Sequence, residues 1–280
     1  MARLMARHFR EDLDADGVCL ITLDRPDRLN ALTFDVYREL TDRFASLADD
    51  SRAHAVVLTG AGRAFCSGGD VHDIIGRLLD MPHEQVLAFT RMTGELIGNM
   101  HRLEKPIIAA VNGVAAGAGA VMAAACDLRV FADSAKIAFL FTRVGLTGAD
   151  MGAGWLLPRL VGEARAAELL LLGDTIDAPT AERYGLATRI VPAAQCLPEA
   201  MALGRRLAQG PLAALASTKR LLRAEWLMDL DTALEAEAQA QAGHLIQPDH
   251  REYHAAFTGK RAARFSGALT APRATQEPAP

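Results

Sequence analysis

The chain has 280 residues, of which half are hydrophobic and 23% are charged, so it can form one or two globular domains around a large core. Its net charge of −4 argues against nucleic acid or a membrane surface as a partner. Its four cysteines form no C-x-x-C pair and no apolar run reaches the ~18 residues that span a bilayer, which predicts reduced thiols in a cytoplasmic protein.

The first half of the chain is predicted to alternate strands with helices. Apolar alternation and short apolar runs indicate strands over 17–23, 54–59, 107–111 and 128–132. Helices are expected after Thr33, which caps the first of them, over 83–101 and over 118–126. Strands and helices that alternate at this spacing favour the α/β class.

From residue 163 onward the chain is predicted to be mainly helical. The expected helices cover 163–172, 180–184, 193–209, 211–226 and 231–246. Gly210-Pro211 is the cleanest break, and it divides a core over 1–210 from a helical segment over 211–265. The last residues, 266–280, contain three prolines and few large apolar groups, which predicts a disordered tail.

Two glycine-rich turns carry the strongest functional signal. The first runs from Gly60 to Asp70 (GAGRAFCSGGD) and the second from Asn112 to Gly119 (NGVAAGAG). Each follows a predicted buried strand, where glycine allows a tight turn and lets a ligand approach bare backbone N–H groups. Two N–H donors that converge from two loops would form an oxyanion hole, which stabilises negative charge on a reacting carbonyl.

Several motifs, in order between about residue 15 and residue 265, resemble the enoyl-CoA hydratase/isomerase (crotonase) family. They are 24–32 (DRPDRLNAL), 65–71 (FCSGGDV), 105–113 (KPIIAAVNG), 126–129 (CDLR), 156–162 (LLPRLVG), 185–186 (GL) and 257–261 (FTGKR). The resemblance implies a spiral of β-β-α turns followed by a C-terminal helical segment. It further implies an acyl-CoA substrate, no cofactor beyond the CoA moiety, and assembly into a homotrimer or homohexamer.

The same resemblance assigns site residues by their place in the motifs. The two oxyanion-hole donors fall on Gly69 and Ala118, and Ala118 would also lie at a helix N-terminus, where negative charge is favoured. Contacts to CoA or the acyl group are implied for Arg28, Leu29, Ala31, Ser67, Gly68, Asp70, Val71, His72, Val114, Gly117, Val121 and Phe141. For Arg28 and His72 an exposed, merely solvated position is the alternative. No residues have metal-ligand spacing, so no metal is expected.

The acid–base groups depart from the family pattern. Hydratases of this family carry two glutamates, and the corresponding positions here hold Val121 and, at or near its place, Phe141. Neither residue can transfer a proton, so hydration by two glutamates is not expected. Asp150 is the acid in this neighbourhood, and it resembles the aspartate that isomerase branches carry ahead of the Leu-Pro-Arg motif. A helix-capping role for Asp150, at a helix that begins at Met151, is the structural alternative.

These residues favour double-bond isomerisation of an enoyl-CoA, with Asp150 as the base. A single carboxylate suits the removal of a proton from one carbon and its return two carbons along, and an apolar wall would raise the pKa of that carboxyl toward working pH. Three alternatives stay open. They are hydration at a non-classical site, hydrolysis or dehalogenation with Asp150 as a nucleophile, and acyl-CoA binding without catalysis.

Overall fold

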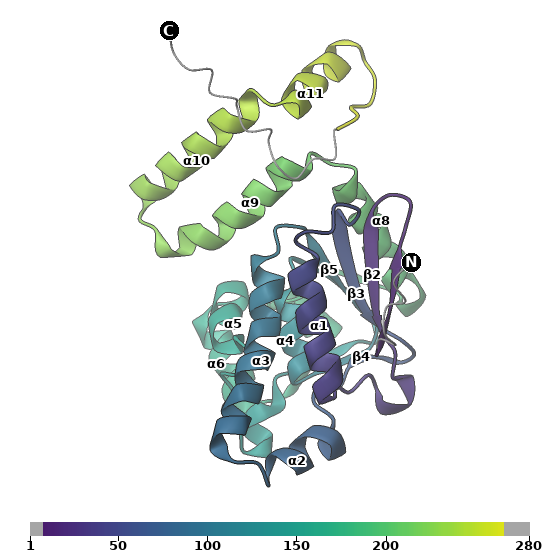
Figure 1. Ribbon diagram of the computed structural model, residues 1–280, viewed down its shortest axis with the longest axis vertical. Helices are drawn as coiled ribbons and strands as arrows, with labels where there is room; N and C mark the ends of the chain where they lie inside the picture. The colour runs from purple at the N-terminus through teal and green to yellow at the C-terminus, as the bar shows by residue number, and fades with distance from the viewer. Residues whose placement is uncertain (1–7, 266–280) are drawn as a thin grey trace. The chain divides into compact units, whose positions relative to one another are not determined.

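The computed structural model describes residues 8–265, which form two compact units that divide between Arg205 and Arg206 (Figure 1). The division falls inside helix α8 (Cys196–Ala208), ahead of the Gly210-Pro211 break. The predicted tail over 266–280 lies outside the described residues. No helix in the described range is both long and apolar enough to cross a bilayer.

The first unit contains two sheets. The six-stranded sheet has the order β1 (Phe9–Leu13), β2 (Val18–Leu23), β3 (Ala55–Gly60), β5 (Ile107–Val111), β7 (Leu128–Ala132) and β10 (Arg189–Val191). The four-stranded sheet has the order β4 (Ala64–Cys66), β6 (Val114–Ala116), β8 (Lys136–Ala138) and β9 (Thr175–Asp177). The outer pairs β1·β2 and β8·β9 are antiparallel, and the other neighbours are parallel.

The chain passes repeatedly from one sheet to the other, which confirms the predicted spiral. The pairs β3–β4, β5–β6 and β7–β8 each place the first strand in the large sheet and the second in the small one, before the chain continues into helical structure. Because the strands of the small sheet have only three residues each, they read as loop in the sequence. Periodicity therefore did not predict the small sheet, and it also missed β1 and β10 at the two edges of the large sheet.

Helices surround these sheets in the first unit. They are α1 (Phe34–Ser46), α2 (Gly76–Leu78), α3 (His83–Arg102), α4 (Ala118–Ala125), α5 (Ala153–Val161), α6 (Glu163–Leu172), α7 (Ala178–Arg183) and α8. As predicted, Thr33 caps α1, because its hydroxyl accepts from the Val36 N–H. Helices α1 and α3 pack side by side (Figure 1), and α4 contacts α3, α5 and strands β4 and β6. Helix α4 therefore joins the elements that carry both glycine turns and Asp150.

The core of this unit is aliphatic, as expected for a chain in which only 5% of the residues are aromatic. Every residue of β3, β5 and α4 is buried. A charged cluster lies at the edge of this core, where Arg43 of α1 binds Glu11 at 2.7 Å and Asp50 at 3.0 Å. The ammonium group of buried Lys105 donates to the carbonyl oxygens of Leu47 and Asp50. These bonds connect the segment just before β5, which leads into the second glycine turn, to the residues that follow α1.

The second unit is helical, as predicted. It consists of the end of α8, α9 (Leu212–Ala224), α10 (Leu230–Leu245) and α11 (Pro248–Thr258). Helix α10 has no buried residue among those described. Large apolar side chains are exposed along the unit, namely Leu222, Trp226, Leu227, Leu230, Leu234, Leu245, Ile246, Tyr253 and Phe257.

Candidate functional site

The two glycine turns lie against each other at the edge of the small sheet. Strands β4 and β6, one within each turn segment, pair in parallel. A Cβ on Gly68 would lie 3.0 Å from the carbonyl oxygen of Ala116 and 3.6 Å from the nitrogen of Ala118. A Cβ on Gly119 would overlap the carbonyl oxygen of Cys66. The turns therefore approach so closely only because glycine occupies both positions.

The backbone N–H groups of Gly69 and Ala118 are both left without a partner by the described residues. Leu32 donates to the Gly68 carbonyl and accepts from the Asp70 N–H, each at 2.8 Å, so the intervening Gly69 N–H points away from Leu32. Ala118 is the first residue of α4, where N–H groups have no partner within the helix. Two unpaired donors thus stand on adjoining turns, where a carbonyl oxygen could accept from them.

Asp150 lies on a strained turn just before α5. Met151 and Gly152 follow it with φ values of +49° and +84°. The Oδ1 atom of Asp150 accepts from the Met151 N–H at 2.9 Å, and no other described group bonds to the carboxyl. Helix α5 begins at Ala153 and has Gly152 as its N-cap, so the capping alternative for Asp150 is wrong. Burial raises the pKa of Asp150, and the bond from Met151 offsets only part of that shift.

Val121 and Phe141, which stand where hydratases of the family have glutamates, are both buried apolar residues. Val121 has no exposed surface within α4. Phe141 is buried, and its Cε1 atom lies 4.0 Å from where a Cβ would stand on Gly117, whose own φ is +51°. Val114, at the start of β6, is partly exposed at the rim of this turn.

The motif over 24–32 packs directly on the first glycine turn. Ser67 donates its N–H to the Leu29 carbonyl at 3.0 Å and its hydroxyl to the Arg28 carbonyl at 3.5 Å. Arg28 is exposed, Ala31 is buried, and Leu29 adopts a left-handed φ of +51°. The structure thus brings Arg28, Leu29, Ala31 and Ser67 together.

Asp70 is engaged within its own turn. Its carboxylate accepts from the N–H groups of His72 and Asp73 at 3.0 and 3.2 Å and pairs with Arg25 at 3.2 Å. Burial opposes ionisation, but these bonds together hold the pKa of Asp70 below its usual value. Val71 and His72 follow it with exposed side chains on the short helical segment Val71–Ile75.

Cys66 is buried in the first turn and does not have the properties of a nucleophile. Burial raises the pKa of its thiol to about 12, and its sulfur accepts a bond of 3.5 Å from the Gly68 N–H. A thiol with that pKa holds almost no thiolate at neutral pH. Its role is to pack the turn, where it is fully buried.

A mainly apolar groove begins at Met151, next to Asp150, and has a volume of about 230 Å³. Its walls are formed by Gly94, Ile97, Gly98 and His101 of α3 and by Met151, Gly152, Trp155 and Leu156 at the start of α5. The His101 and Trp155 rings meet edge to face at 5.0 Å. Because Gly94 and Gly98 lack side chains, the groove remains open along α3.

Tyr37 of α1 is a residue near this site that sequence reasoning missed. Its hydroxyl oxygen lies 4.0 Å from the position of a Cβ on Gly69. In the sequence, Tyr37 follows Val36 on the apolar face of an amphipathic helix, so it reads as an ordinary core residue. Its phenolic oxygen was the one available signal, because a polar atom on a buried face needs a partner.

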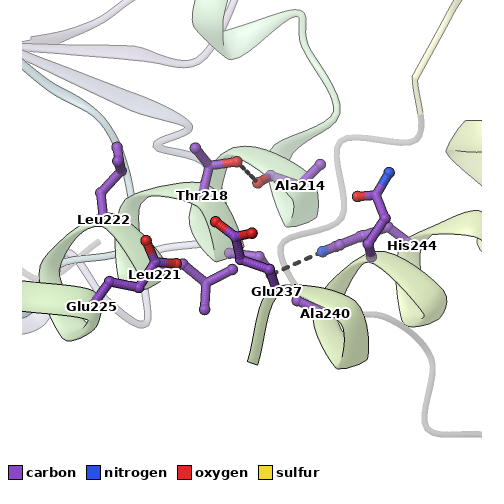
Figure 2. Close-up of a pocket in the computed structure, with 10 residues that line it drawn as sticks. Ala214, Thr218, Leu221, Leu222, Glu225, Glu237, Ala240 and His244 are labelled. Atoms are coloured by element: carbon purple, nitrogen blue, oxygen red, sulfur yellow. Dashed lines mark hydrogen bonds between the residues drawn. The ribbon is translucent and has the colours of Figure 1, made fainter. Parts of the chain in front are cut away.

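A second cavity lies in the helical second unit, between α9 and α10, and has a volume of about 350 Å³ (Figure 2). Its residues are Ala214, Ser217, Thr218, Leu221, Leu222, Glu225, Glu237, Ala240, Gln241 and His244. His244 and Ser217 are hydrogen-bonded at 2.9 Å across it. Within residues 8–265, this cavity included, no three His, Cys, Asp or Glu side chains are grouped so that they could hold a metal ion.

Comparisons with known proteins find relatives that match most of the chain. A family model described as enoyl-CoA hydratase/isomerase matches residues 14–268. The 1,2-epoxyphenylacetyl-CoA isomerase of Escherichia coli K12 is 36% identical over 251 residues, which are 90% of this chain and 95% of that protein. A candidate enoyl-CoA hydratase structure from Streptomyces coelicolor A3(2) has a TM-score of 0.91 and 48% identity, over 96% of this chain and all of that one. The enoyl-CoA hydratase of Bacillus anthracis has a TM-score of 0.87 and 31% identity, over 94% of this chain and all of that one.

Proposed function

The chain belongs to the enoyl-CoA hydratase/isomerase family, and on that premise we propose that it moves the double bond of an enoyl-CoA thioester. The observation that carries this proposal is the presence of one half-buried carboxylate, Asp150, where two carboxylates would be needed for ordinary hydration. Val121 and Phe141 stand at the other acid positions and cannot move a proton.

In the proposed reaction the thioester oxygen accepts hydrogen bonds from the N–H groups of Gly69 and Ala118. Negative charge on that oxygen grows as a carbon of the acyl group loses a proton. Each such donor stabilises the transition state by about 3–4 kcal/mol. Asp150 takes the proton from one carbon, which gives a dienolate, and returns it two carbons along. Its raised pKa suits a group that must both accept and release a proton.

The acyl group would occupy the groove between α3 and α5. That groove starts at Met151, the residue after Asp150, and its walls are mainly apolar, so it can bury a hydrocarbon chain or ring next to the base. The exposed Arg28 and His72 beside the first glycine turn would meet the CoA moiety. The chemistry requires no cofactor beyond that moiety.

Deuterium exchange tests the proposal. The protein is incubated in heavy water with a 2-enoyl-CoA and a 3-enoyl-CoA, and the products are weighed by mass spectrometry. Deuterium uptake with interconversion of the two substrates supports isomerisation. Gain of water would instead indicate hydration, loss of the CoA thiol would indicate hydrolysis, and no change in either substrate would indicate a binding protein.

A matched pair of variants assigns the base. Asp150→Asn should bind acyl-CoA and lose deuterium exchange, because the amide cannot accept the proton. Asp35→Asn is the control, since Asp35 is an exposed aspartate on α1 that pairs with Arg38 at 3.6 Å. Unchanged exchange in Asp150→Asn would remove Asp150 from the mechanism.

We also propose that the protein assembles into a homotrimer or homohexamer through the helical segment. The support is the exposed apolar surface of α9 to α11, which includes Trp226, Leu227 and Phe257. Light scattering after size-exclusion chromatography measures the mass of the assembly directly. A monomer at micromolar concentration would contradict this proposal and leave the site chemistry untouched.

A further inference from the structure

Tyr37 brings a side-chain donor to the turn that carries Gly69. Its ring is buried between α1 and α3, where it packs against the Phe89 ring in a T-shaped arrangement, with centroids 5.6 Å apart and an interplanar angle of 87°. Phe89 is held in turn by Phe34 at 4.8 Å. These contacts fix the ring, and its hydroxyl oxygen ends 4.0 Å from the Cβ position of Gly69.

The Tyr37 hydroxyl has no hydrogen-bond partner among the described residues. A polar group buried without a partner costs stability, so its presence requires an explanation. Every described side-chain oxygen that solvent cannot reach does have a partner. The unpaired Tyr37 oxygen therefore borders a space that a water molecule or a ligand atom can enter.

The electrostatic surroundings keep this phenol protonated. Burial raises the pKa of Tyr37 well above its usual value, and the nearby Cys66 and Asp150 raise it further. Asp150 is thus close enough to act on the hydroxyl through its charge, although the two groups are not hydrogen-bonded. A neutral phenol in this position is a permanent donor that faces the space beside Gly69 and Asp150.

We propose that the Tyr37 hydroxyl is a third hydrogen-bond donor to the enolate oxygen of the bound acyl-CoA, beside the N–H of Gly69. This inference rests on the proposed function, which places that oxygen at Gly69. The hydroxyl donates a hydrogen bond and keeps its proton, so Asp150 remains the base. Hydrogen bonds from a hydroxyl to an anionic oxygen are short and strong, which means that the bond stabilises the enolate more than the neutral thioester.

Acetoacetyl-CoA is a suitable probe, because its enolate and keto forms differ in ultraviolet absorbance. The ratio of the two forms when bound, measured across a pH titration, reports how strongly the site favours the enolate. Tyr37→Phe removes only the oxygen and should lower the enolate-to-keto ratio at a fixed pH about tenfold or more. The turnover number for proton exchange should fall by a similar factor with little change in KM.

Tyr184→Phe is the matched control, because it removes the hydroxyl that approaches Glu168 at 3.3 Å outside the site. It should leave the ratio unchanged. Tyr37→Met repeats the test with an unrelated apolar side chain, and thermal melts identify any variant that fails to fold. A wild-type ratio in folded Tyr37→Phe would overturn the role of Tyr37 alone. A wild-type protein that binds the probe but does not favour its enolate over the free ligand would overturn the oxyanion hole itself, and the Tyr37 inference with it.

Discussion

Gly119→Ala perturbs the contact between the two glycine turns without touching the substrate. The added Cβ would overlap the Cys66 carbonyl oxygen and would lie 2.7 Å from the Cys66 Cβ and 2.9 Å from its carbonyl carbon. Neither backbone segment can move away easily, so we expect the upper end of the cost of overpacking, about 3 kcal/mol. Higher helix propensity of alanine offsets about 1 kcal/mol of that cost. The net loss is about 2 kcal/mol.

Thermal unfolding and deuterium exchange together test this reasoning. A loss of about 2 kcal/mol corresponds to a fall of roughly 4–8 °C in melting temperature for a protein of this size. If α4 shifts by about 1 Å to relieve the overlap, the Ala118 N–H moves with it and the exchange rate falls on the order of 100-fold. Gly243→Ala in α10 is the control, because a Cβ there meets no other atom within 4 Å. A variant with the melting temperature and rate of the wild type would show that the turns are not locked together.

The remaining predictions concern charge, shape and the buried ion cluster. Asp150→Asn should raise the melting temperature at neutral pH, because burial raises the pKa of Asp150 and the ionised carboxylate destabilises the folded state. Melting curves at several pH values should show that this gain vanishes below the ordinary pKa of 3.8, where the carboxyl is protonated in both the folded and the unfolded state. Gly94→Ala places a Cβ in open space, so it should add about 1 kcal/mol to helix stability and lower kcat/KM for long acyl chains but not for crotonyl-CoA. Arg43→Met removes the buried cation that the half-buried carboxylates Glu11 and Asp50 share, although Asp50 keeps its pair with Arg52. The loss should cost about 3 kcal/mol in urea unfolding, and a cost below about 0.5 kcal/mol would contradict that account.

The four central strands of the large sheet and most helices could be predicted from the sequence because their periodicity is strong, whereas the edge strands β1 and β10 could not. The apolar runs of β3, β5 and β7 and the Thr33 cap are local signals, and each appears in the structure within a residue or two. Strands β4, β6 and β8 have only three residues each, too few to show a period, and they are stabilised by pairing with chain segments far away in the sequence.

The candidate site divides in the same way. Glycine at positions 68, 117 and 119 predicted two turns with bare N–H groups, because close backbone contact requires glycine and glycine is visible in the sequence. The position of the Tyr37 hydroxyl could not be predicted in this way, because only the packing of α1 against α3 places it near Gly69. Asp150 does not cap α5 because that helix begins at Ala153, and the sequence did not fix this boundary to within a few residues.

The turn after Asp150 holds a long side chain in a backbone geometry that usually belongs to glycine. Such a conformation costs about 1–2 kcal/mol, so selection for heat resistance would favour asparagine or glycine in place of Met151. The same exchange would withdraw the thioether from the wall that it shares with Ile97 and Trp155. Under the proposed function, in which this groove holds the acyl group, a substitution of Met151 that raises thermal stability also alters substrate preference.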